Sequence, residues 1–174
     1  YYRQALENDQ YMLSLHTELY HVASYLELEQ ARFEEKLVVE LDVEDDLNCK
    51  VPSFILQPLV ENAVRHGGDR TGARHVSISA HSVEGMAEIA VADRGQGIPR
   101  EVVLGLYTGQ GKGVGLSNVH KRLKSIYGED NGLKIETSEA GSRVWFRIPL
   151  EPEEIPGPIH ETKQEESYNE DSCD

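Results

Sequence analysis

Three short polar segments follow one another along the chain, and their residue types fit one kind of site. The first carries Asn62 on an expected helix, the second begins with Asp93 at the end of an expected strand, and the third is the glycine-rich run 111–115 before another helix. An Asn side chain offers Mg²⁺ a neutral oxygen, and free N–H groups at a helix start attract phosphate. Asp93 could accept a hydrogen bond from the amine of adenine. Together the segments predict a pocket for ATP and its magnesium ion.

Each segment alone also has a plainer interpretation. The run that starts at Asp93, DRGQG, is a good turn sequence, because Asp can cap its own backbone. Asn62, Arg65 and His66 share one helix face, which could simply be solvated, although Arg65 is also a suitable cation for phosphate. Lys112 could reach phosphate or be only a charge on a lid. The run 111–115 lacks the Gly-Lys-Ser/Thr ending of a Walker A loop.

The hydrophobic pattern indicates the elements that hold these segments. An apolar stripe from Met12 to about residue 32 predicts an amphipathic helix, either core-facing or part of a coiled coil. Alternation predicts a strand over 37–43 and hairpins that turn near 84–85 and 141. A second helix opens at 52–53 and either begins regularly near Pro58 or is kinked there. We expect a loop over 98–112, a helix over 114–126, and overall a two-layer α/β sandwich.

Composition narrows the class of protein. The chain has 174 residues, enough for one core, and a net charge of −14. Residues 151–174 hold nine acidic side chains and one lysine, a net charge of −8, and we expect them to form a disordered tail. This balance argues against DNA or RNA as a partner. Cys49 and Cys173 lack metal-ligand spacing and are interpreted as reduced thiols.

Longer stretches resemble one family of proteins. The three segments are similar to the N, G1 and G2 boxes of the Bergerat ATP-binding fold of gyrase, Hsp90, MutL and histidine kinases. Residues 25–33 (YLELEQARF), 52–67 (PSFILQPLVENAVRHG) and 113–123 (GVGLSNVHKRL) closely resemble sensor histidine kinases of the LytS/YehU type. The similarity covers roughly residues 12–150. It implies a mixed, mostly antiparallel sheet covered on one face by helices, and it accounts for Pro58.

The resemblance also implies roles for single residues. Asn62 would bind magnesium, Asp93 would read adenine, and Ser142 stands where these kinases usually carry a Thr that helps to hold the base through a water. Glu61 is the catalytic candidate, since ATPases of the superfamily use a water-activating Glu at this position. The expected ATP-binding residues are Asn62, Arg65, His66, Asp93, Gly95, Gly97, Ile98, Gly111, Lys112, Gly113, Val114, Gly115, Leu116 and Ser142.

The phosphoacceptor motif of this family, His-Phe-(apolar)-Phe-Asn, does not occur in the chain, and neither His16 nor His21 fits it. We therefore expect an ATP-binding catalytic module that donates the γ-phosphate to a His on an upstream dimerisation segment, for relay to a response regulator. The full-length protein would be a homodimer. The alternatives are a nucleotide-switched binding module and an ATPase that uses Glu61.

The expected organisation is a linker helix over 1–34, a catalytic domain over 35–150 and the tail over 151–174. No apolar run is long enough to cross a membrane, and the chain begins with Tyr rather than Met, as a fragment of a longer protein would. We expect a cytoplasmic domain, and this composition is compatible with a membrane anchor upstream in the parent protein.

Overall fold

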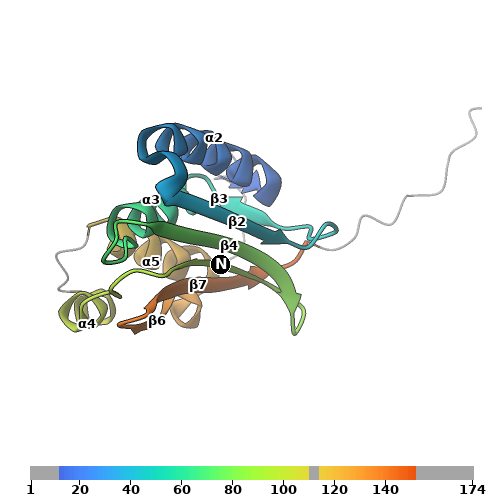
Figure 1. The fold of residues 1–174 in the computed structure, drawn as a ribbon. Helices are drawn as coiled ribbons and strands as arrows, with labels where there is room; N and C mark the ends of the chain where they lie inside the picture. Colours follow the sequence, from blue (N-terminus) through green and yellow to red (C-terminus); the bar gives the residue numbers. More distant parts are fainter. Residues whose placement is uncertain (1–11, 110–113, 152–174) are drawn as a thin grey trace, which may run out of the picture.

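A five-stranded sheet with helices on one face forms the body of the protein (Figure 1). The computed structural model describes residues 12–109 and 114–151. The strand order is β2-β4-β5-β7-β6, with β2 and β4 parallel and every other pair antiparallel. The strands are β2 Leu37–Val43, β4 Arg74–Val83, β5 Met86–Asp93, β6 Lys134–Ser138 and β7 Gly141–Pro149. The expected two-layer α/β sandwich with a mostly antiparallel sheet is confirmed.

The helices supply the second layer. They are α2 Leu15–Phe33, α3 Gln57–His66, α4 Arg100–Thr108 and α5 Val114–Tyr127, with short 3₁₀ turns η2 Glu34–Lys36 and η3 Glu129–Asn131. Apolar side chains of α2, α3 and α5 form one buried cluster with alternate residues of the strands, such as Ile78, Ile89 and Phe146. Burial of this apolar cluster, rather than helix propensity, holds the two layers together.

The first helix begins later than expected. Residues Met12–Ser14 form a short strand, β1, which pairs antiparallel with β3 (Lys50–Pro52). Ser14 has extended backbone angles, and its hydroxyl accepts a hydrogen bond from the Thr17 amide at 3.2 Å, so it is the N-cap of α2. The apolar spacing at Met12 therefore fits a strand that leads into the helix, and the prediction of helix at residues 12–14 was wrong.

The second helix resolves the ambiguity at Pro58. Helix α3 starts at Gln57, so Pro58 lies in its first turn, where its missing N–H removes no helical hydrogen bond. The regular helix thus begins near Pro58 after an irregular turn, which was the first of the two alternatives. Phe54, which the expected start of this helix at 52–53 would have made helical, lies in that turn and is 61% exposed.

The segment between β5 and α5 contains a helix where a loop was expected. Helix α4 starts after Pro99 and ends at Gly109, whose φ of 74° closes the helix in the left-handed conformation. Its apolar residues are consecutive rather than spaced at three and four, and only Gly105 and Leu106 are buried. The loop prediction for 98–112 was therefore wrong over Arg100–Thr108, while residues 110–112 lie outside the described part.

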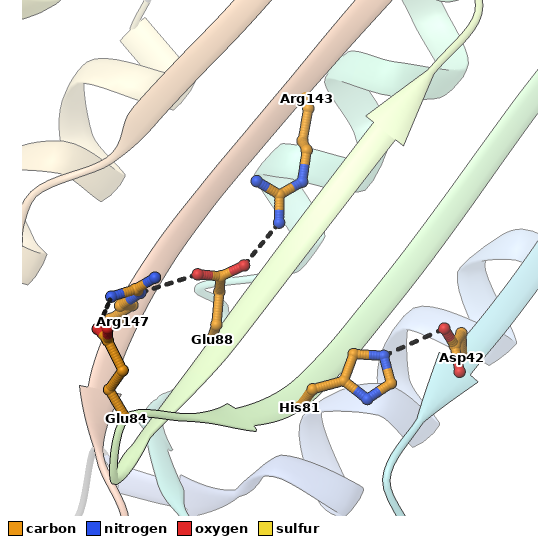
Figure 2. A network of polar contacts seen from close by, with 6 residues as sticks. All are labelled: Asp42, His81, Glu84, Glu88, Arg143 and Arg147. Carbon is orange, nitrogen blue, oxygen red and sulfur yellow. Dashed lines mark hydrogen bonds and ion pairs between the residues drawn. The ribbon is translucent and has the colours of Figure 1, made fainter.

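The face of the sheet opposite the helices carries a network of polar contacts (Figure 2). Glu88 on β5 accepts hydrogen bonds from Arg143 at 2.7 Å and Arg147 at 2.8 Å on β7. Arg147 also pairs with Glu84 at the hairpin turn. These ion pairs link neighbouring strands on the open face, which leaves the helix face of the sheet for the core and the candidate site.

Candidate functional site

The C-terminal end of α3 and the loop after β5 touch backbone to backbone. Gly67 is buried, and a Cβ built on it would lie 2.7 Å from the Cβ of Asp93. Gly95 is also buried, and its Cβ would lie 2.6 Å from the Cα of Gly67. Glycine is required at both positions because any side chain would push the two segments apart. Gly67 therefore closes the end of α3 against the Asp93 loop.

The Asp93 carboxylate is half-buried at the end of β5 and already has one polar contact. The Gly95 amide donates a hydrogen bond to its Oδ1 at 2.8 Å. Burial raises the pKa of Asp93 above its ordinary value, while backbone hydrogen bonds from Gly95 and Ser142 and the nearby His66 act in the opposite direction. The turn interpretation and the ligand interpretation are thus compatible, because a carboxylate has two oxygens and about four acceptor sites.

Three polar side chains form a row across neighbouring strands on the helix face of the sheet. Asp93 is paired with Ser142, and Ser142 with Thr137, so their side chains point to the same side. The two hydroxyls are 3.1 Å apart, and the Ile98 amide donates to Thr137 Oγ1 at 2.7 Å. The row borders an open hollow of about 370 Å³. Asp93 therefore has a polar neighbour on β7, as a site that binds the edge of a base requires.

Thr137 is a polar residue of this row that the motifs did not indicate. The turn at residues 139–140 brings Thr137 opposite Ser142, and this register is set by the hairpin pairing rather than by a motif. Gly97 secures the same corner: with a φ of 81°, a Cβ there would lie 2.2 Å from the Ser138 carbonyl oxygen. The loop that leaves β5 is thus attached to the end of the β6–β7 hairpin.

The residues predicted on α3 divide into two environments. Asn62 is half-buried, whereas Arg65 and His66 are exposed on the last turn. The Glu61 carboxylate accepts a hydrogen bond from Gln57 Nε2 at 2.9 Å and is among the charges that raise the pKa of Tyr25 on α2, after burial and Glu29. The one hydrogen bond of the Glu61 side chain among the described residues is thus within its own helix.

The start of α5 lies over the first half of α3. A Cβ built on Gly115 would be 3.9 Å from Pro58 Cβ, and Asn62 is one turn further along the same face of α3. Leu116 is buried at 6% exposure and anchors this end of α5, while Gly115 is exposed. The free N–H groups and the positive dipole of α5 therefore begin beside the helix that carries Asn62.

The predicted lid residues Gly111, Lys112 and Gly113 lie outside the described residues, and of Val114 the structure describes only the backbone as the first residue of α5. The remaining predicted residues come from the end of β5, its loop, α3, the start of α5 and β7, and these elements meet at one end of the sheet (Figure 1).

Metal-binding groups are few at this end. In the described ranges, no three His, Cys, Asp or Glu side chains gather in a way that could hold an ion. The half-buried amide of Asn62 is a single neutral oxygen donor, which fits a Mg²⁺ that arrives with phosphate oxygens and keeps several waters. Such an ion would balance phosphate charge when bound, and Asn62 would orient it.

Comparison with known proteins assigns the family. The profile of histidine kinase-, DNA gyrase B-, and HSP90-like ATPases matches residues 52–152, more than half of the chain. The chain belongs to this family. The match begins at the end of β3 and includes α3, the Asp93 loop, α5 and the β6–β7 hairpin, which are the elements that form the candidate site.

Similar curated relatives are sensor kinases. The sensor histidine kinase YpdA of Escherichia coli is 40% identical over 151 residues, which are 85% of this chain and 26% of YpdA. The sensor protein LytS of Bacillus cereus is 39% identical over 148 residues, 80% of this chain and 25% of LytS. The resemblance to LytS-type sensor kinases is confirmed, and the chain spans about a quarter of the length of these relatives.

Solved structures agree on the fold. The catalytic domain of the histidine kinase ThkA superposes with a TM-score of 0.62 at 20% identity, covering 80% of this chain and 94% of that domain. ThkA in complex with the response regulator TrrA gives a TM-score of 0.63 at 19% identity, over 82% of this chain and 42% of ThkA. In the described part of the chain, no helix has the length and apolar character needed to cross a membrane.

Proposed function

We propose that this chain is the ATP-binding catalytic module of a two-component sensor histidine kinase. The observation that carries the proposal is the position of Asp93, a half-buried carboxylate at the end of β5, in a row with Ser142 and beside the end of the helix that bears Asn62. Asp93 would accept a hydrogen bond from the adenine amine, and Asn62 and the start of α5 would hold magnesium and phosphate.

In the reaction, a histidine ring nitrogen on a segment upstream in the parent protein attacks the γ-phosphorus of ATP. A nitrogen–phosphorus bond forms, the bond to the β-phosphate oxygen breaks, and ADP leaves. The module contributes positioning and charge stabilisation, the usual protein share of phosphoryl transfer. The phosphoryl group then passes to a response regulator, a partner supported by the complex of ThkA with TrrA.

Several features of the parent protein belong to the same proposal. We infer a homodimer that forms through the upstream segment, a catalytic module over 35–150 preceded by a linker helix, and a cytoplasmic location for the module. Helix α2 buries Leu15, Val22 and Leu26 in the same core as α3, so movement of the linker would reach the module directly. The predicted acidic tail lies outside the described residues, except for Glu151.

Transfer is favoured over hydrolysis by the surroundings of Glu61. Its carboxylate accepts a hydrogen bond from Gln57 within the same helix, an arrangement that fits a structural role better than activation of water. The second alternative, a nucleotide-switched module without transfer, has no specific observation in its support.

Incubation with γ-labelled ATP tests the proposal. The isolated chain should bind Mg·ATP without acquiring acid-labile label, because the acceptor motif is absent from its sequence. A longer chain of the parent protein that includes the upstream segment should become labelled and should pass the label to a response regulator. Stable self-labelling of the isolated chain, or no labelling of the longer one, would contradict the proposal, and steady phosphate release that is lost in Glu61→Gln would favour the ATPase.

A further inference from the structure

The turn between β3 and α3 is held by side chains from two other helices. It comprises residues 53–56, and Phe54 adopts a φ of 56° there, a left-handed conformation that is costly for a bulky residue. Such a conformation persists only where surrounding contacts impose it. The turn leads directly into α3, so its geometry sets where the helix carrying Asn62 begins.

The main contact comes from Glu18 on α2, which is 1% exposed. Its Oε2 accepts a hydrogen bond from the Phe54 amide at 3.0 Å, and its Oε1 accepts one from the Leu56 amide at 3.0 Å. Leu56 is the N-cap of α3 and provides no side-chain cap of its own. The Glu18 carboxylate therefore occupies the positive end of α3 and satisfies both amides from another helix.

Two further contacts close the turn. Arg122 on α5 donates a hydrogen bond to the Ser53 carbonyl oxygen. The His21 ring, one turn after Glu18 on α2, stacks on the Phe54 ring with a centroid distance of 6.2 Å and an interplanar angle of 17°. Helices α2 and α5 thus both bind the segment that starts α3.

We propose that the 53–56 turn, fixed by Glu18 and Arg122, positions the nucleotide-binding helix α3 against the start of α5. These are positioning residues, since they act through α3 and α5. The inference rests on the proposed function, because it concerns how the ATP site is assembled. Its geometric basis is that the first turns of α3 and α5 lie close together. Gly115 of α5 lies beside Pro58 of α3, and Pro58 is two residues after Leu56. Displacement of α2 would then move Asn62 relative to the α5 amides.

The first test replaces the carboxylate in the 174-residue chain. Glu18→Gln keeps the size but turns one acceptor into an amide NH₂ that faces a backbone N–H. The lost hydrogen bond lies within the protein and its free energy bounds the effect, so we expect a loss of Mg·ATP affinity of up to about tenfold, measured by calorimetry well below the melting temperature of the variant. The amides of Phe54 and Leu56 should also exchange faster with solvent. Glu27→Gln, an exposed position on the same helix, should change neither quantity.

Arg122→Gln tests the other side of the turn. If Glu18→Gln does not fold, this variant alone tests the positioning role of the turn. It should lower Mg·ATP affinity in the same direction, while Lys121→Gln, exposed and adjacent on α5, should not. Unchanged affinity in a folded Glu18→Gln variant with a lower melting temperature would show a purely structural role and overturn the inference, as would unchanged affinity in Arg122→Gln. Failure of the wild-type chain to bind Mg·ATP would instead contradict the proposed function.

Discussion

Asp93 has a structural role and a proposed binding role. It accepts the Gly95 amide and so shapes the loop after β5, and it also presents a half-buried carboxylate beside Ser142 at the candidate site. Burial raises its pKa, which means that the charged form is destabilised in the folded chain. A half-buried carboxylate whose charged form is destabilised, at the end of a strand near a helix terminus, has the properties of a binding residue.

Replacement of Asp93 by Asn should separate the binding role from the role in shaping the loop. Asp93→Asn removes the charged acceptor proposed for adenine, so Mg·ATP affinity should fall by about ten- to a hundredfold, the value of a hydrogen bond to a charged group. Competition binding with ATP and GTP would measure both affinity and base preference. Asp42→Asn, on the open face and paired with His81, is the matched control. Equal ATP affinity in wild type and Asp93→Asn would refute the assignment.

The same variant should not lose stability at neutral pH. Because the folded-state pKa of Asp93 lies above its ordinary value of 3.8, its contribution to stability is greatest below that value and is lost as the pH rises through the folded-state pKa. Asp93→Asn has no charge to bury, so its melting temperature at pH 7 should equal or exceed that of the wild type. The difference should shrink as the pH falls toward 4. Denaturation followed by circular dichroism at several pH values would test this, and a marked loss of stability at pH 7 alone would contradict it.

The residues of the candidate site and its support differ in how far the sequence alone predicts their role. Asp93 and Asn62 were indicated by local motifs, and strand pairing then placed Ser142 opposite Asp93. Thr137 carries no motif and depends on the register of a distant hairpin. Glu18 falls on the apolar stripe of α2, between the buried Leu15 and Val22, where a carboxylate needs a buried donor. Its donors are backbone amides 36 and 38 residues later, which a local pattern cannot supply.

At the scale of elements, the site depends on how closely α3 approaches the end of β5. Gly67→Ala should lower the unfolding free energy by about 1–3 kcal/mol, since its Cβ would meet the Ala63 carbonyl oxygen at 2.3 Å and Asp93 at 2.7 Å. Gly68→Ala is a close control, because its Cβ would be 3.5 Å from Arg74, an ordinary contact. Urea denaturation of both variants would measure the difference. Equal stability would mean that the α3 end is not packed as described.

The elements themselves were predictable where their periodicity was clear. Strands β4 and β7 alternate buried and open residues, β5 does so except at the buried Ala90, and each was expected at nearly its observed position. Helix α4 was missed because its apolar residues are adjacent in the sequence and are interrupted by Gly105. This pattern indicates no buried helix face. Residues Met12–Ser14 continue the helical spacing of α2, and only their pairing with β3 makes them a strand. Tertiary pairing decided the outcome in that case.

At the scale of the whole molecule, the two faces of the sheet differ in the residues they carry. The open face carries ion pairs that join β5 to β7, and the covered face carries the apolar core and the candidate site (Figures 1 and 2). The site lies where the helix layer and the sheet meet, with Asp93 on one layer and Asn62 on the other. A nucleotide bound there would connect both layers, so binding should stabilise the fold as a whole.

Thermal unfolding should therefore respond to nucleotide and metal together. A ligand that binds only the folded chain adds about 2.7 kcal/mol at a hundred times its dissociation constant, which for a domain of this size corresponds to a rise in Tm of roughly 5–10 °C. We expect this rise with Mg·ATP and a smaller one when EDTA removes the metal, because Asn62 would no longer reach the phosphates through Mg²⁺. In Asn62→Ala the responses with and without metal should converge, since the variant lacks the proposed metal contact. A full metal-dependent rise in Asn62→Ala would place the magnesium contact elsewhere, and no rise in the wild type would exclude a nucleotide site that spans the two layers.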